Sequence, residues 1–182
     1  MKQLLVISRF IDALNEWVGK GATWLILATV LISAGNALMR KFFGQGTNAL
    51  LEIQWYFFAA VFTLGSGYAF LRNAHVRIDF LSNKFSARTR NWIDVGGILI
   101  FLLPLCYMMF TLTWPLLVQA YETGEMSFNP GGLIRWPVYA MLPAGFSLLA
   151  LQGLSELLKR LHFIFGDGPD VLAHDHSHEA VE

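Results

Sequence analysis

Four long stretches of this chain lack Asp, Glu, Lys and Arg altogether: residues 21–39, 53–71, 95–121 and 136–155. As helices rising about 1.5 Å per residue, even the shortest two would reach roughly 28 Å, close to the ~30 Å hydrocarbon core of a bilayer. Only 14% of the 182 residues are charged, whereas about a quarter are charged in an average soluble domain. These absences predict an all-α integral membrane protein with four transmembrane helices.

Cysteine and histidine are also scarce where a cofactor would need them. Cys106 is the only cysteine, so an intrachain disulfide is impossible, and no histidine lies in the four runs. A haem held inside a membrane bundle would need such imidazoles. Three histidines alternate in the tail, where they could bind a divalent metal but have no fixed geometry; these are His174, His176 and His178. We therefore expect no cofactor and no metal site.

The usual signatures of an enzyme or of an ion-coupled carrier are missing as well. There is no nucleophile with a neighbouring base, no phosphate-binding Gly-rich loop and no carboxylate pair at membrane depth. Carriers usually reveal themselves by ionisable groups inside the membrane. The main polar groups in or near the runs are explained by hydrogen bonds between helices; they are Asn36, Gln119 and Gln152. The net charge of zero and the lack of a basic patch argue against nucleic acid.

The basic residues indicate how the chain is oriented. Ten of the thirteen Lys and Arg lie in the N-terminal segment, in the connection after the second run, and in the tail. By the positive-inside rule these segments face the cytoplasm, so both termini are expected there. Arg9, Asp12 and Glu16 interrupt any short apolar core, so we expect no cleaved signal peptide.

The chain divides into three predicted parts. Residues 1–20 are expected to form an amphipathic helix in the membrane interface, with apolar residues at helical spacing (Leu4, Ile7, Ile11, Leu14 and Val18). A simple lead-in to the first span is an equally good interpretation. Residues 21–162 are the four-helix membrane domain, and residues 163–182 are a disordered His-rich tail.

Two features suggest how the spans pack. The third run is longer than the membrane requires and contains Pro104 and Pro115, so we expect it to bend near Pro115 and to project outward. Gly65 and Ala69, four residues apart in the second run, could allow a neighbouring helix to approach closely. For any single small residue, an ordinary place in a membrane helix is about as good an explanation.

The segment after the second run mixes charged and apolar residues, as in LRNAHVRIDFL, and follows LLEIQWYFFAAVFTLGSGYAF. This order resembles the small membrane subunit of tripartite ATP-independent periplasmic (TRAP) transporters, which has a charged residue opening the second span and a His-x-Arg-x-Asp element after it. The later stretch GEMSFNPGGLIRWPVYAMLPAGFSLLALQGL also resembles that family. The resemblance covers roughly residues 10–162.

The resemblance implies a non-catalytic scaffold. Its partners would be a large sodium-coupled membrane subunit, which holds the substrate, and a periplasmic binding protein, which delivers a solute such as an organic acid. Two groups of residues are implied as partner contacts: Glu52, Glu122, Glu125 and Arg135 on the outer side, and Arg72, His75, Arg77, Asp79, Arg88 and Arg90 on the inner side.

Two alternatives from other classes stay open. The chain could be the membrane anchor of an enzyme complex, which the lack of histidines in the runs argues against. It could also be a small self-associating exporter, which the lack of a carboxylate inside the runs argues against.

Overall fold

The computed structural model describes residues 2–44, 46–73 and 85–166. They form α1 (Lys2–Phe43), α2 (Asn48–Leu71), α4 (Ala87–Gly97), a π-helical segment η1 (Ile98–Leu102), α5 (Leu103–Thr123) and α6 (Trp136–Phe165). The segments α4, η1 and α5 join into one helical span, so four helices are long and apolar enough to cross a membrane. The predicted all-α architecture with four spans is confirmed.

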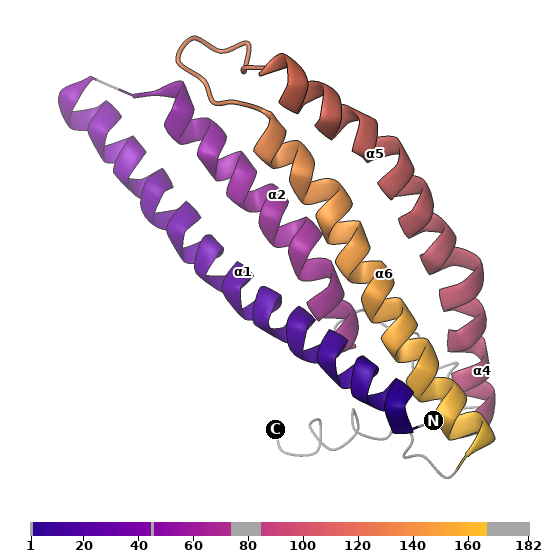
Figure 1. Cartoon of the computed structure of the whole chain (residues 1–182). Helices are drawn as coiled ribbons and strands as arrows, with labels where there is room; N and C mark the ends of the chain where they lie inside the picture. The colour runs from indigo at the N-terminus through magenta and orange to yellow at the C-terminus, as the bar shows by residue number, and fades with distance from the viewer. Residues whose placement is uncertain (1, 45, 74–84, 167–182) are drawn as a thin grey trace, which may run out of the picture.

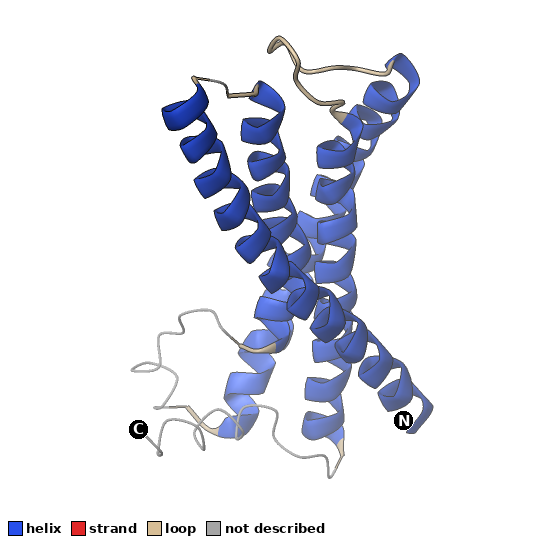
Figure 2. Cartoon of the chain, turned by 90° about the vertical axis from the view of Figure 1, so that its left-hand side faces the viewer, coloured by secondary structure: helices blue, strands red, loops and turns tan. Residues whose placement is uncertain are grey.

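The four spans lie side by side, with α2 and α6 in the middle and α1 and α5 on the flanks (Figure 1). Figure 2 shows that α1 crosses the others obliquely, so that its first half lies beside α6 and its second half beside α2. We call the end at which α1 begins the N-terminal end, and the end that carries residues 124–135 the loop end. Each span runs from one end to the other, so the chain alternates between them.

The first helix differs from the prediction. Residues 1–20 were expected to form a separate interfacial helix, but residues 2–20 are the first half of the uninterrupted helix α1. Its polar side, which includes the buried Ser8 and Asn15, faces the bundle, while the apolar side chains of Phe10 and Trp17 are 70% and 76% exposed. The helix does not turn because no proline breaks it, and because polar groups on α6 supply partners for its polar side.

The irregularity in the third span lies earlier than expected. The π-helical segment occupies Ile98–Leu102 and ends two residues before Pro104. The Leu103 N–H donates to the Ile98 carbonyl, five residues earlier in the chain. A proline cannot donate such a bond, and its ring conflicts with the carbonyl four residues earlier, so a wider turn accommodates it. Helix α5 is continuous through Pro115, where the sequence had predicted the bend.

Glycines allow α2 and α6 to approach each other closely, but not the glycine that the sequence singled out. A Cβ built on Gly145 of α6 would lie 2.5 Å from the Thr63 carbonyl oxygen of α2. A Cβ on Gly67 would meet the Asn15 side chain of α1, whereas one on Gly65 would meet nothing within 4 Å. Spacing along one helix did not distinguish them, because the contact is defined by the neighbouring helix.

We expect Gly145→Ala to destabilise the bundle by about 1–3 kcal/mol, because the added methyl group meets backbone and α2 must move away. The matched control is Gly65→Ala, which adds the same methyl group in open space and should be neutral or slightly stabilising through its higher helix propensity. Thermal unfolding in detergent measures both. Equal midpoints for the two variants would contradict the close approach at Gly145.

Candidate functional site

Glu52, in the first turns of α2, organises the loop end. Its side chain is buried, with only 4% of the residue exposed. One carboxylate oxygen accepts hydrogen bonds from the Ser127 hydroxyl and from the Asn129 amide (2.8 Å), and the other accepts from the Leu133 backbone N–H at 2.7 Å. We call these four residues the Glu52 cluster. One carboxylate therefore fixes three points of a loop about 80 residues further along the chain.

The same face of α2 holds the loop at two more places. Asn48, four residues before Glu52, donates to the Pro130 carbonyl at 2.9 Å. Tyr56, four residues after it, donates its hydroxyl proton to the Ile134 carbonyl, also at 2.9 Å. Residues i, i+4 and i+8 share one side of a helix. The loop thus lies along a polar stripe at the start of α2.

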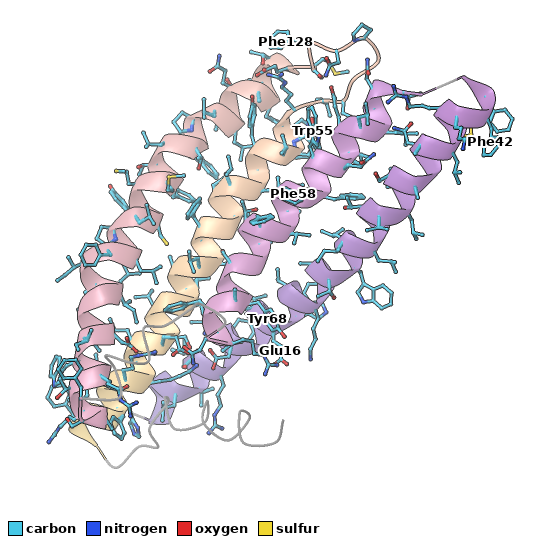
Figure 3. All side chains as sticks on the ribbon, turned by 180° about the vertical axis from the view of Figure 1, so that it is seen from behind. Glu16, Phe42, Trp55, Phe58, Tyr68 and Phe128 are labelled. Carbon is cyan, nitrogen blue, oxygen red and sulfur yellow. The ribbon has the colours of Figure 1, made fainter. Side chains whose placement is uncertain are left out.

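The loop also closes on itself and exposes an aromatic side chain. Met126 and Ile134 form an antiparallel β-bridge, and Arg135 pairs with Glu125 at 2.9 Å. The hydrogen bond to Glu125 raises the pKa of Arg135. The guanidinium lies 4.6 Å from the centre of the Phe128 ring, which is 87% exposed and stands at the outer edge of the loop (Figure 3).

A second group of polar residues lies inside the N-terminal end. Lys159 of α6 bridges Asp12 of α1 at 2.7 Å and Glu156 at 2.8 Å. Arg160, only 1% exposed, pairs with Glu156 and, at 3.1 Å, with Asp94 of α4. We call these five residues the buried ion network. It joins α1, α4 and α6 through alternating charges.

Neutral polar groups extend the buried ion network along α1. The Gln152 amide donates to Asp12 at 2.9 Å and accepts from Asn15 at 3.0 Å. The hydroxyls of Ser8 and Ser155 lie 2.7 Å apart, and Ser155 donates to Asp12. The prediction that Gln152 takes part in hydrogen bonds between helices is confirmed.

The predicted contact residues fall into two sets at opposite ends. Glu52, Glu125 and Arg135 hold the loop, and Glu122 lies in the last turn of α5. At the other end, Arg72 hydrogen bonds to Glu16 at 2.8 Å and lies over the Tyr68 ring; Glu16 and Tyr68 appear together in Figure 3. Arg88 of α4 donates to the Ile164 carbonyl at 2.7 Å. Arg90 follows it two residues later in the same helix. His75, Arg77 and Asp79 lie outside the described residues.

The buried ion network was not predicted from the sequence. Asp12 and Glu156 fall outside the charge-free runs, so the runs did not indicate that these two carboxylates share the Lys159 ammonium. A signal was present: polar residues recur every three or four positions on both helices, as Ser8, Asp12 and Asn15 do on α1. Two polar stripes in apolar helices predict that the stripes face each other.

These arrangements hold the helices and the loop rather than perform chemistry. Every carboxylate of the two clusters accepts hydrogen bonds or pairs with a cation. The two serine hydroxyls that donate to these carboxylates, those of Ser127 and Ser155, link the loop to α2 and α6 to α1. Among the residues that the structure describes, no group of three or more His, Cys, Asp or Glu could hold a metal ion.

Comparison with known proteins identifies one family. Residues 29–163, well over half of the chain, match the family described as tripartite ATP-independent periplasmic transporters, DctQ component. No curated protein and no solved structure matches the chain.

We expect Glu52→Gln to release the loop, because an amide places donors opposite the donors of the Glu52 cluster. Losing charged hydrogen bonds worth about 1.5–3 kcal/mol should speed amide exchange at Leu133 by about ten- to hundredfold. Hydrogen exchange measured by mass spectrometry tests this. Glu122→Gln removes the same charge from an exposed residue and should leave the exchange of the loop unchanged; similar protection in both variants would contradict the anchoring role.

Lys159→Gln should destabilise the bundle by about 3 kcal/mol, because it leaves Asp12 and Glu156 without their shared cation in the interior. The matched control is Lys20→Gln. Lys20 pairs with Glu16 at 3.0 Å on the surface, with 66% of its side chain exposed, and should contribute less than about 1 kcal/mol. Thermal unfolding compares the two. Equal losses would show that burial of the ion network adds nothing.

Proposed function

Because the chain belongs to the DctQ family of TRAP transporter components, we propose that it is the scaffold on which the large, sodium-coupled membrane subunit is assembled. It is a multi-pass membrane protein and a transporter component, not an enzyme. In this proposal it also helps to seat a periplasmic binding protein that delivers the solute, with organic acids as the expected class.

The distribution of charge supports a scaffold rather than a carrier. In the described residues, the ionic contacts gather at the two ends of the bundle, while the middle of each span contains no Asp, Glu, Lys or Arg. A carrier needs costly polar groups or interrupted helices near the membrane midplane. Charge pairs at both ends instead fix the helices against one another, which suits a body that stays still while a partner moves.

The outer face of the bundle supports contact with the large subunit. Towards the loop end, α1 lies on the flank of the bundle beside α2 and exposes large apolar side chains: Trp24, Val30, Leu31, Leu38 and Phe42 are all more than half exposed. Figure 3 shows Phe42 directed away from the bundle. Lipid or an apolar partner can cover such a surface, and the family membership favours a second membrane subunit for part of it.

The anchored loop supports contact with the binding protein. Five hydrogen bonds from or to Asn48, Glu52 and Tyr56 hold the loop in one conformation. A partner that binds a preformed loop loses less conformational entropy than one that must order it. The exposed Phe128 ring, beside the Arg135–Glu125 pair, offers an aromatic contact surrounded by charge, as is common in protein interfaces. On the orientation inferred from the basic residues, this loop faces the periplasm.

Co-purification tests the proposal. The chain, tagged and expressed with its native operon, should retain a large polytopic membrane protein in a one-to-one ratio in mild detergent. Replacing His75, Arg77 and Asp79 together with alanine should lower this ratio severalfold, because the resemblance implies that they anchor the partner. Recovery of the chain alone, with transport activity of its own in liposomes, would overturn the scaffold and favour an exporter.

The Glu52→Gln variant separates the two partners in the same preparation. It should retain the large subunit, because Glu52 contacts only the loop, and it should slow solute uptake at low concentrations of binding protein. If uptake equals that of the unaltered chain at every concentration of binding protein, the loop is not part of the docking surface.

A further inference from the structure

A pocket between α5 and α6 at the loop end has no part in either polar cluster. Its volume is about 300 Å³, and five of its lining residues come from one face of α5: Trp114, Leu117, Val118, Tyr121 and Glu122. Trp136, the first residue of α6, closes the other side. The volume is at the small end of the range for ligand pockets, sufficient for a headgroup and the first part of a chain.

Three aromatic residues, Trp114, Tyr121 and Trp136, form part of the wall. The rings of Tyr121 and Trp136 pack edge to face, with centres 5.7 Å apart and planes at 85°. Trp114 is fixed by stacking on Phe110, with ring centres 5.4 Å apart. Tyr121 is 67% exposed and Trp114 is 49% exposed, so the pocket is accessible from outside. The faces of Trp and Tyr rings attract cations.

The surface of the pocket is mostly apolar, and the one charged residue that borders it is acidic. Glu122 is its only ionisable carboxylate, and no Lys or Arg lines it. Arg135, next to Trp136, is already paired with Glu125 at 2.9 Å. Within the part of the chain that the structure describes, Glu122 makes no ion pair of its own. An anionic ligand would be repelled here, whereas an ammonium group would gain both the carboxylate and the ring faces.

The position of the pocket matches the level of lipid headgroups. The helical span Ala87–Thr123 would be about 55 Å long at 1.5 Å per residue, far more than the ~30 Å apolar core. Its last turn, which carries Tyr121 and Glu122, therefore lies beyond the hydrocarbon, and the helix ends at Gly124 in the left-handed conformation (φ 60°). Trp and Tyr residues are typical of this interface.

We propose that this pocket binds the headgroup of an ammonium-bearing phospholipid of the phosphatidylethanolamine class. The ammonium group pairs with Glu122 among the rings of Trp114, Tyr121 and Trp136, and the first methylenes of the lipid lie against Leu117 and Val118. The inference rests on the pocket of this chain alone and is independent of the proposed partners.

Native mass spectrometry of the full chain in detergent tests the site with two defined lipids, dioleoyl-phosphatidylethanolamine and dioleoyl-phosphatidylglycerol, at equal concentration. The unaltered chain should retain the ethanolamine lipid about tenfold more than the glycerol lipid, as expected when one ammonium contact is lost. Glu122→Gln, which is nearly isosteric, should reduce this ratio to about twofold or less. Trp136→Leu should reduce it similarly, provided that its thermal midpoint is unchanged.

The matched control is Trp24→Leu, which removes an equally large ring that is 71% exposed on α1, away from the pocket. It should leave the ratio unchanged. Equal retention of the two lipids by the unaltered chain would overturn the proposal. So would a ratio that Glu122→Gln does not alter, or one that Trp24→Leu lowers as much as Glu122→Gln does, since lipid would then bind to the apolar surface in general.

Discussion

A polar side chain inside this bundle must find its partner within the protein, because the surroundings of a membrane helix supply none. The architecture follows from how this requirement is met. At the N-terminal end, Lys159 satisfies two carboxylates from different helices. At the loop end, Glu52 satisfies three donors from one loop. These two sets of contacts determine how α1 and the loop sit on the central pair of helices.

Between the two ends, close packing replaces charge. Helices α2 and α6 come so near at Gly145 that a single methyl group would touch backbone. The π-helical turn before Pro104 keeps the third span continuous although proline removes one of its hydrogen bonds. Packing of this kind is favourable only if the helices have one relative position, and the charged ends impose that position. The result is a bundle suited to remaining fixed.

The chain belongs to the DctQ family of transporter components, and the contacts at both ends of the bundle are compatible with the scaffold role proposed above. Transport by alternating access requires one part of the assembly to move against another. In the part of the chain that the structure describes, Lys159 and Arg160 pair with carboxylates at one end of the bundle and Arg135 pairs with Glu125 at the other, and these pairs need not change during such a cycle. On the proposal above, the chain would instead contribute a surface with an anchored loop at one end and apolar helix faces along its length. The specificity for a solute would then reside in its partners.

The sequence by itself determined the number of spans and the family. Charge-free runs of membrane length and the LRNAHVRIDFL segment are both local patterns. It did not reveal that Asp12 and Glu156 meet, nor that Gly145 rather than Gly65 is the close approach. Residue types predict which helices can cross the membrane, because the cost of burying a helix depends on its own side chains. Only the tertiary structure decides which buried group meets which, because the partner lies on another helix, up to 147 residues away in the sequence. How that helix is rotated about its axis, and how deep its groups lie, is not encoded in a local pattern.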